Sequence, residues 1–201
     1  MSCESKRRIR KDYAEQEIGS CQQRIENMIT AKQFSQAFER VSHEQQVTLL
    51  QCWPSQPKFT HYIKHQMMPA IAEDVECSLD LEYKRIDIVF RPLPGPESDG
   101  MAIPKIVAAI EHENNFGGSD SEVRKLRMLP VPLGVLITYV SVPRRRQQLV
   151  EFAKLLAAAS SESVPLGEML LIIGPYGMKA PANLEWEYFV FREREFEQIA
   201  L

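Results

Sequence analysis

Three acidic side chains lie within or at the end of segments that have the apolar character of buried β-strands. Asp87 interrupts the apolar stretch at residues 86–90, and Glu111 and Glu113 end the most apolar stretch of the chain, residues 106–113. Charged residues rarely enter buried strands unless they are paired or bind a metal ion. Side chains alternate between the faces of a strand, so Glu111 and Glu113 point the same way. If the two strands pair antiparallel, Asp87 can meet both glutamates across the ladder.

Carboxylates gathered in this way have a chemistry of their own. Three of them on one face of a sheet repel one another, and a divalent cation among them removes that repulsion. Hard oxygen ligands suit Mg²⁺ or Mn²⁺. The alternative is that Asp87 and Glu111 pair with lysine or arginine side chains and simply lie at strand ends. The spacing of all three residues favours a metal site over that alternative.

The spacing of apolar residues predicts the elements that would hold these side chains. The predicted helices of the N-terminal part are 8–40, 43–52 and 59–77. Trp53-Pro54 stops the second helix, and residues 55–58 are predicted to be a turn or linker. Pro69 lies inside the third helix and predicts a kink or a break. The apolar stripe of the first helix consists of Ile18, Cys21, Ile25, Met28 and Ile29.

The remaining pattern alternates between strands and helices. Predicted strands are 78–83, 85–91, 105–113, 134–140, 168–173 and 185–192, and predicted helices run from Asp120 or Ser121, as N-cap, to 128 and from 144 to 159. This order predicts an α/β fold with a mixed central β-sheet flanked by helices on both faces. Residues 1–54 are predicted to be an N-terminal helical extension of an α/β domain, residues 55–201. A proline- and glycine-rich loop, 91–104, separates two of the strands.

An Asp in one strand, Glu-x-(Lys or Glu) at the end of the next, then a helix and a further strand, resembles the PD-(D/E)xK, or restriction-endonuclease-like, nuclease superfamily. The resemblance covers about residues 59–140 and implies a restriction-endonuclease-like core. It also implies that Asp87 and Glu111 bind Mg²⁺ or Mn²⁺, with the backbone carbonyl of His112 as third ligand. The sequence departs from the pattern at Ile86, where a proline often stands, and at Glu113, where the lysine usually stands.

Some members of the superfamily draw the lysine from the following helix, and Lys125 is suitably placed for that role. A salt bridge between Lys125 and Glu122, three residues apart, is the equal alternative. The implied reaction is metal-assisted hydrolysis of a phosphodiester bond in DNA, in which Glu113 binds a second cation or acts as general base. A restriction or defence role would suit such an endonuclease.

Three consecutive arginines, Arg144, Arg145 and Arg146, follow a predicted strand at the start of a helix. Cations there oppose the helix dipole, and a bound phosphate would offset that cost. They are therefore candidate nucleic-acid contacts, the alternative being an ordinary solvated surface. The basic segment at residues 6–11 is either an arm toward DNA or a soluble terminus.

Composition limits the classes of protein. The 201 residues are 44% hydrophobic and 25% charged, which excludes collagen, coiled coil and wholesale disorder. No apolar run approaches the length of a membrane helix, and no export signal or nucleotide-binding glycine motif is apparent. The four cysteines contain no CxxC pair, so we do not expect a disulfide framework. We expect instead that the protein resides in a reducing cytoplasm.

A second class of function stays open. The net charge of −3, the acidic C-terminal third and the missing lysine at 113 suit a catalytically degenerate protein of the same fold that binds nucleic acid or a protein partner. The apolar stripe of the N-terminal helices could also pack against a second copy in a homodimer, or form the interface of an antagonist or assembly factor.

Overall fold

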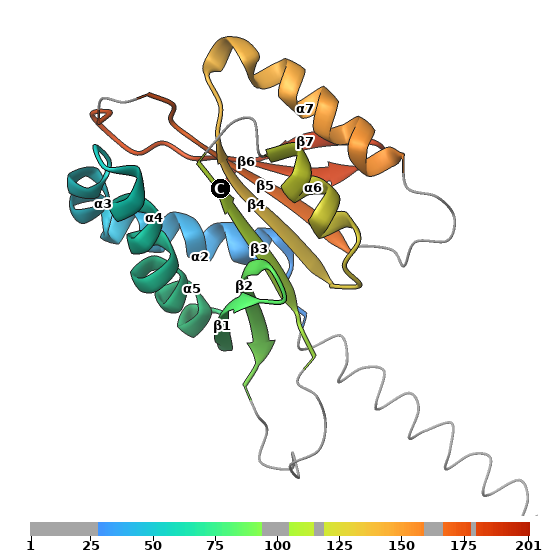
Figure 1. The fold of residues 1–201 in the computed structure, drawn as a ribbon, viewed down its shortest axis with the longest axis horizontal. Helices are drawn as coiled ribbons and strands as arrows, with labels where there is room; N and C mark the ends of the chain where they lie inside the picture. The colour runs from blue at the N-terminus through green and yellow to red at the C-terminus, as the bar shows by residue number, and fades with distance from the viewer. Residues whose placement is uncertain (1–27, 94–104, 115–118, 159–166, 178–179) are drawn as a thin grey trace, which may run out of the picture.

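The computed structural model describes residues 28–93, 105–114, 119–158, 167–177 and 180–201. Helices cover both faces of a single seven-stranded sheet (Figure 1). The strands are β1 (Cys77–Tyr83), β2 (Ile86–Pro92), β3 (Ala108–Glu113), β4 (Leu133–Tyr139), β5 (Glu168–Gly174), β6 (Glu187–Arg192) and β7 (Glu195–Ile199). The helices are α2 (Ala31–Glu44), α3 (Gln46–Cys52), α4 (Gln56–Tyr62), the π-helical turn η1 (Ile63–Met67), α5 (Met68–Asp74), α6 (Ser119–Arg127) and α7 (Val142–Ala157).

The order of strands in the sheet follows the chain, from β1 at one edge to β7 at the other. Strand β3 runs parallel to β4, and β4 runs parallel to β5, whereas every other neighbouring pair is antiparallel. Parallel neighbours need crossover connections, and α6 and α7 provide them. The α/β class and the mixed sheet flanked by helices are therefore confirmed.

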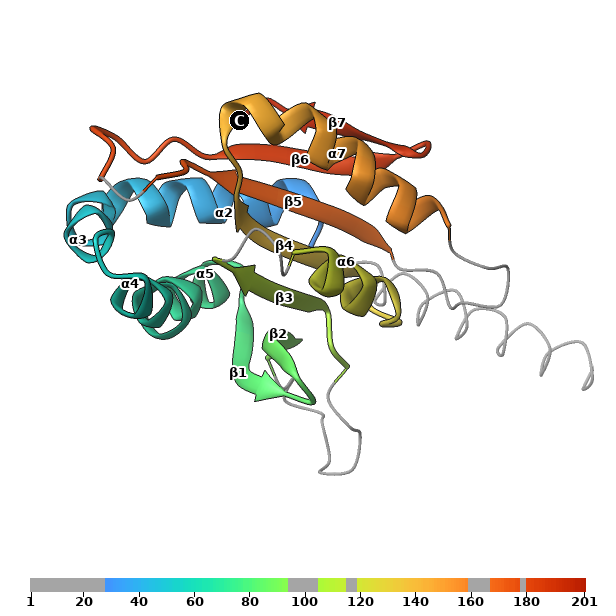
Figure 2. The same ribbon diagram turned by 45° about the horizontal axis from the view of Figure 1, so that its top comes forward.

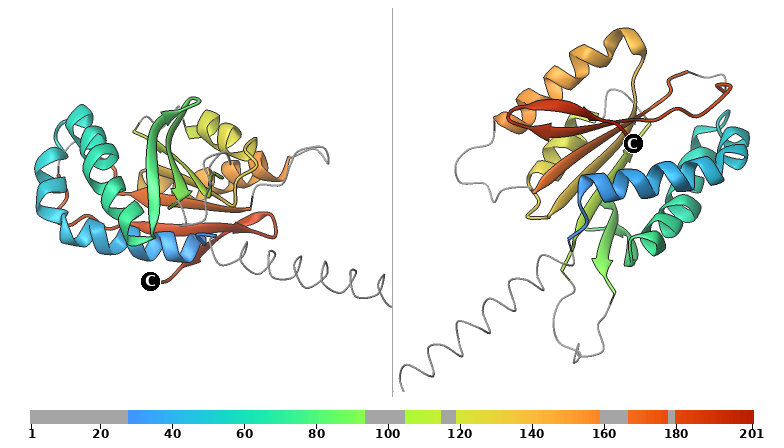
Figure 3. Two further views of the ribbon diagram at one scale, coloured as in Figure 1. Left: turned by 90° about the horizontal axis from the view of Figure 1, so that it is seen from below. Right: turned by 180° about the vertical axis from the view of Figure 1, so that it is seen from behind.

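Each face of the sheet has its own apolar core. On one face Phe34 and Phe38 of α2 and Ile63 of η1 pack against β-strand side chains such as Phe90 and Ile110. The core on the other face consists mainly of Val123, Leu126, Leu136, Phe152 and Leu171. Figures 2 and 3 show helices α2 to α5 on the first face and α6 and α7 on the second. All seven residues of β4 are buried, as a strand covered on both faces requires.

The helix predicted over 8–40 is wrong at residues 28–30, which are not helical. Thr30 has an extended backbone, and its hydroxyl accepts the Gln33 N–H while the Gln33 side chain accepts the Thr30 N–H. This capping box starts helix α2. A carboxylate oxygen of Glu168 accepts the Ala31 N–H at 2.7 Å and fixes that start to the sheet.

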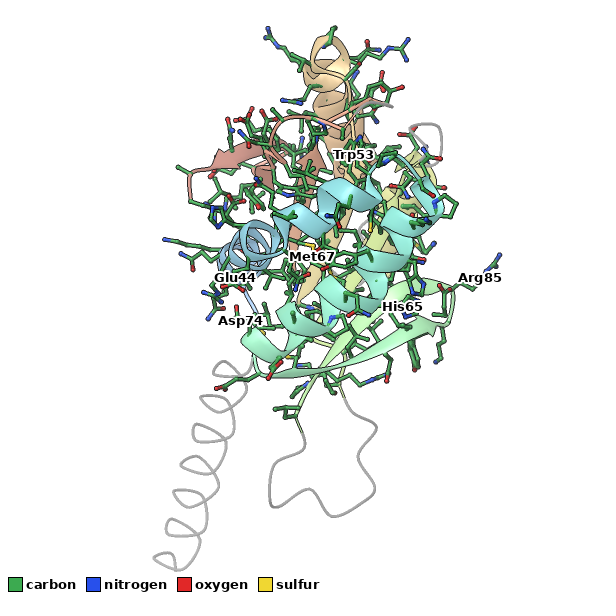
Figure 4. All side chains as sticks on the ribbon, turned by 90° about the vertical axis from the view of Figure 1, so that its left-hand side faces the viewer. Glu44, Trp53, His65, Met67, Asp74 and Arg85 are labelled. Carbon is green, nitrogen blue, oxygen red and sulfur yellow. The ribbon has the colours of Figure 1, made fainter. Side chains whose placement is uncertain are left out.

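The helix predicted over 59–77 contains the break that Pro69 suggested. The Met68 N–H donates to the Ile63 carbonyl, a π-helical bond, one residue before Pro69. Proline has no N–H for the helical ladder and crowds the preceding turn, so a local change of helical pitch relieves both effects. In Figure 4, Met67 lies between the helices and the sheet, whereas His65 lies on the outer side. The predicted linker at 55–58 is shorter than expected, because Pro57 lies in the first turn of α4.

Two hairpins close on residues that sequence patterns do not mark as turns. Lys84 and Arg85 join β1 to β2, and Glu193 and Arg194 join β6 to β7, all four with positive φ. Two-residue hairpin turns usually take Asn or Gly at such positions. Strand β7 was therefore not predicted, and the sheet has one strand more than expected.

The remaining differences between the predicted and observed elements are small, and some predictions concern residues outside the described ranges. Asp120 and Ser121, the two predicted N-caps, both lie inside α6, because the helix begins at Ser119. The apolar side chains of α2 lie in the same core as those of α4 and α5. The domain boundary after residue 54 stays a prediction. Residues 6–11, Ile18, Cys21, Ile25 and most of the 91–104 loop lie outside the described residues. In the described part, no helix is long and apolar enough to cross a membrane.

Candidate functional site

The site begins where β2 and β3 pair. The antiparallel register places Ile88 opposite Ile110, so the next position along each strand places Asp87 opposite Glu111. Residues opposite each other in a ladder share a face of the sheet. The main chain supports the pairing, since the His112 N–H donates to Oδ2 of Asp87 at 3.0 Å. Two of the three carboxylates predicted to converge, Asp87 and Glu111, are therefore neighbours.

Lys125 reaches Glu111 from helix α6. Its Nζ lies 2.9 Å from Oε1 of Glu111 and also forms an ion pair with Glu122. The same ammonium group donates to the backbone carbonyl of Arg85, at 3.0 Å, in the β1–β2 turn. Lys125 thus forms the ion pair with Glu122 that one alternative predicted, and it also contacts Glu111; its role as a site lysine stays a prediction. Glu111 and Glu122 outweigh burial, which alone would lower the pKa of Lys125, and the net shift is upward.

Asp87 has a lysine of its own, from the opposite layer of helices. Lys64 Nζ, on the π turn, lies 2.7 Å from Oδ1 of Asp87 and 3.1 Å from a carboxylate oxygen of Glu82. Burial alone would lower the pKa of Lys64, but the hydrogen bonds and charges of Asp87 and Glu82 raise it overall. No sequence pattern marks Lys64 as a site residue. No spacing rule links it to Asp87, and its only signal was a cation beside the apolar stripe that contains Ile63 and Met67.

Glu111 is the most perturbed acid of the site. Its side chain is 2% exposed, and burial raises its pKa to about 7. Lys125 opposes that shift, whereas the charges of Asp87 and Glu122 add to it. A carboxyl group that titrates near neutral pH is suited to proton transfer in catalysis.

His112 turns its side chain away from the two glutamates, as the strand alternation predicted. Its ring lies in the core on the α2–α5 side, where Nε2 is 2.8 Å from the Tyr139 hydroxyl. Burial lowers the pKa of His112 to about 4, so the ring is neutral near pH 7. The side chain therefore packs in the core, and the predicted metal ligand at this residue is its backbone carbonyl alone.

Glu113 lies two residues beyond Glu111 on the same face, and is half-buried. Its register partner on β4 is Thr138, whose hydroxyl lies 2.9 Å from that of Ser119 at the start of α6. Within the described ranges, no three His, Cys, Asp or Glu side chains are grouped as a metal site. The structure thus brings Asp87 and Glu111 together, whereas Glu113 lies two residues further along β3.

The chemistry of Asp87 and Glu111 fits a divalent cation. Two carboxylates on one face, with the main chain of His112 beside them, are the hard oxygen donors that Mg²⁺ and Mn²⁺ take. Their mutual repulsion is visible in the contribution of Asp87 to the raised pKa of Glu111. Lys64 and Lys125 now balance the two charges, so a cation would have to compete with ammonium groups for the same oxygens.

The three arginines lie near the start of α7, as predicted, and are its third to fifth residues because the helix begins at Val142. We call this segment the arginine turn. Arg145 forms an ion pair with Glu187 of β6 at 2.5 Å, whereas Arg144 and Arg146 are exposed. Helix α7 begins three residues after β4, and β4 runs parallel to β3 with Thr138 beside Glu113. The arginine turn and Glu113 therefore lie at the same end of the sheet.

Comparisons with known proteins identify no family. No protein-family model matches the chain, and no curated protein matches it in sequence.

Proposed function

We propose that the protein is an Mg²⁺- or Mn²⁺-dependent endonuclease that hydrolyses phosphodiester bonds of DNA. One observation carries the proposal: Asp87 and Glu111 lie opposite each other on paired strands, and Lys125 from the next helix contacts Glu111. The resemblance to the PD-(D/E)xK superfamily called for an acid in each strand and a lysine near the second acid. Lys125 supplies the lysine that position 113 lacks.

The order of elements supports the same proposal. Helix α5 is followed by strands β1, β2 and β3, then by helix α6 and strand β4. This is the helix, three strands, helix and strand of the superfamily's core. We therefore extend the proposal to the fold, as a restriction-endonuclease-like core within the seven-stranded sheet.

Each residue of the site has a role in the proposed reaction. Asp87, Glu111 and the His112 carbonyl would hold the cation, which when bound supplies charge neutralisation at the scissile phosphate and a more acidic attacking water. The positive charge of Lys125 would stabilise the negative charge that develops on the phosphate oxygens. Glu113 would bind a second cation or accept a proton from the attacking water.

The arginine turn of α7 gives the DNA a second point of contact. Arg144 and Arg146 are exposed at the end of the sheet where β3 and β4 finish. Arginines there would bind backbone phosphates and set the position of the duplex without reading its sequence. A restriction or defence role would follow from such an activity.

The direct test is cleavage of supercoiled plasmid DNA with Mg²⁺ or Mn²⁺. Wild-type protein should nick or linearise the plasmid, the reaction should stop when EDTA removes the cation, and Asp87→Ala should be inactive. The control variant Asp80→Ala changes an exposed acid on the neighbouring strand that pairs with Arg91, and should cleave like wild type. Cleavage that persists in Asp87→Ala would refute the assignment.

A second candidate is a degenerate protein of the same fold that binds nucleic acid or a protein partner. The observation in its favour is that Lys64 and Lys125 already neutralise Asp87 and Glu111. In that case the ion pairs would serve stability, and added cation would change neither the melting temperature nor the plasmid. DNA binding in a gel-shift assay without cleavage would favour this second candidate.

A further inference from the structure

The side chain of the helical layer that contacts Asp87, Lys64, belongs to the π turn η1. Its characteristic bond runs from the Met68 N–H to the Ile63 carbonyl, and Lys64 is the second residue of the turn. A π turn adds about one residue to a helical turn and rotates the residues around it. Short π segments of this kind occur frequently at functional sites. Here the turn lies in the helix that faces the start of β2.

Lys64 holds one oxygen of Asp87, and the main chain holds the other. Oδ1 lies 2.7 Å from Lys64 Nζ, and Oδ2 accepts the His112 N–H at 3.0 Å. The Lys64 side chain is only 16% exposed, so its charge is largely withdrawn from water. A cation that takes Oδ1 must displace the ammonium group, because two positive charges at one oxygen repel each other.

The displaced ammonium group has a second partner within reach. Oε1 of Glu82 lies 3.1 Å from Lys64 Nζ, and the Glu82 side chain is 70% exposed. Lys64 can therefore leave Asp87 by moving toward solvent while it keeps an ion pair with Glu82. Arg85 lies at the tip of the same hairpin, on the side of the helical layer where His65 lies (Figure 4).

We propose that Lys64 is a positioning residue that holds Asp87 in the cation-free protein, competes with the divalent cation for Oδ1, and moves to Glu82 when the cation binds. The inference rests on the proposed function, since it requires that Asp87 bind a cation. It assigns a role to a residue that lies on the opposite side of the site from Lys125. Lys64 thereby sets the affinity of the site for metal. Glu82 favours the release of Lys64 from Asp87.

Titration calorimetry of the full chain with Mn²⁺, without DNA, tests this role. Lys64→Gln should bind Mn²⁺ roughly tenfold more tightly than wild type, because the competing charge is gone. Lys64→Arg keeps the charge and should stay near wild type. The control Lys58→Gln removes an exposed charge from helix α4 and should leave the affinity unchanged. Circular dichroism of each variant checks that the fold is kept.

Glu82→Gln gives an independent test that spares the buried lysine. Without its second partner, Lys64 should stay on Asp87, so the variant should bind Mn²⁺ several-fold more weakly than wild type. In the Lys64→Gln background the same change should have little effect, and such a double-mutant cycle isolates the coupling of the two residues.

The possible results separate this inference from the proposed function. Equal or weaker Mn²⁺ binding by Lys64→Gln, with wild-type binding that Asp87→Asn abolishes, would overturn the role of Lys64 alone. Additive effects of Glu82→Gln and Lys64→Gln would overturn the transfer to Glu82. A wild-type protein that binds no Mn²⁺ would overturn both this inference and the proposed function.

Discussion

Lys125 and Glu111 form an ion pair, 2.9 Å between Nζ and Oε1, that joins helix α6 to the end of the strand before it. The glutamate is buried, whereas the lysine is one-third exposed. Removal of either partner therefore has unequal consequences. Lys125 can be solvated without Glu111, but Glu111 without Lys125 would be a carboxylate in a largely apolar place.

Lys125→Gln should lower the rate of plasmid cleavage by roughly 10² to 10³-fold, the usual cost of losing one donor aimed at developing charge. Lys125→Arg should recover part of the rate, since it keeps the positive charge. Lys154→Gln, on the exposed side of α7, is the matched control and should cleave at the wild-type rate. Single-turnover rates at saturating Mg²⁺ make the comparison, and an unaffected Lys125→Gln rate would remove Lys125 from the mechanism.

Glu111→Gln should change how stability depends on pH. Burial raises the pKa of Glu111 from 4.5 to about 7, so between these values the folded state binds a proton that the unfolded state has lost. The contribution of Glu111 to stability is therefore complete below pH 4.5 and is lost as pH rises through about 7, on the order of 3 kcal/mol in all.

Glu111→Gln has no carboxyl group to ionise, so it does not lose this stability as pH rises. Its stability relative to wild type should therefore increase between pH 5 and pH 8. Urea denaturation at both pH values measures the difference. At pH 8, without metal, Glu111→Gln should be at least as stable as wild type. A variant less stable by roughly 3–5 kcal/mol at pH 8 would mean that Glu111 serves mainly to balance Lys125.

His112→Gln should change how stability depends on pH in the acid range, as pH falls. Burial lowers the pKa of His112 from 6.5 to about 4, so the unfolded state binds a proton in this window and the folded state does not. The stability from neutral His112 is present above pH 6.5 and is lost as pH falls toward 4, about 3 kcal/mol in all. Glutamine can still bond to the Tyr139 hydroxyl, so relative to wild type the variant should gain stability between pH 6.5 and pH 4.5. Urea denaturation of both proteins at the two pH values measures this gain. The same difference in unfolding free energy between variant and wild type at both pH values would contradict the prediction.

Arg145 and Arg146 should differ in their effects on DNA binding. Arg146 is exposed, so Arg146→Gln should reduce the slope of log affinity against log salt by about one phosphate contact. Arg145 is held by Glu187, so Arg145→Gln should leave that slope nearly unchanged and cost about 0.5–1 kcal/mol of stability. Fluorescence anisotropy with a DNA duplex at several salt concentrations measures the slopes, and equal slopes for the two variants would refute the distinction.

The sequence predicted most of the fold because burial leaves a periodic trace. The apolar runs at β3 and β4 and the alternation at β2 identified strands. The register of β2 and β3 in the structure then places Asp87 beside Glu111. What escaped prediction depends on backbone conformation. Glu193 and Arg194 adopt positive φ without the usual glycine or asparagine, so nothing in the sequence marked the hairpin to β7.

Regular spacing also explains why part of the candidate site could be predicted. Asp87, Glu111 and Lys125 lie on elements whose spacing is regular, and the structure brings them together. Lys64, which contacts Asp87, belongs to the π turn that precedes Pro69, where the helical pitch departs from that of a regular α-helix. Helical periodicity assumes 3.6 residues per turn, so it misplaces side chains wherever the pitch changes.

The central claim is that Asp87 and Glu111 together bind one divalent cation. Electron paramagnetic resonance of free Mn²⁺, titrated with the full chain, measures this directly because bound Mn²⁺ leaves the free signal. We expect the wild-type protein to bind Mn²⁺ in the absence of DNA, and both Asp87→Asn and Glu111→Gln to lose that binding while they keep the fold. A wild-type protein that leaves the Mn²⁺ signal unchanged, or variants that bind as wild type does, would contradict the claim.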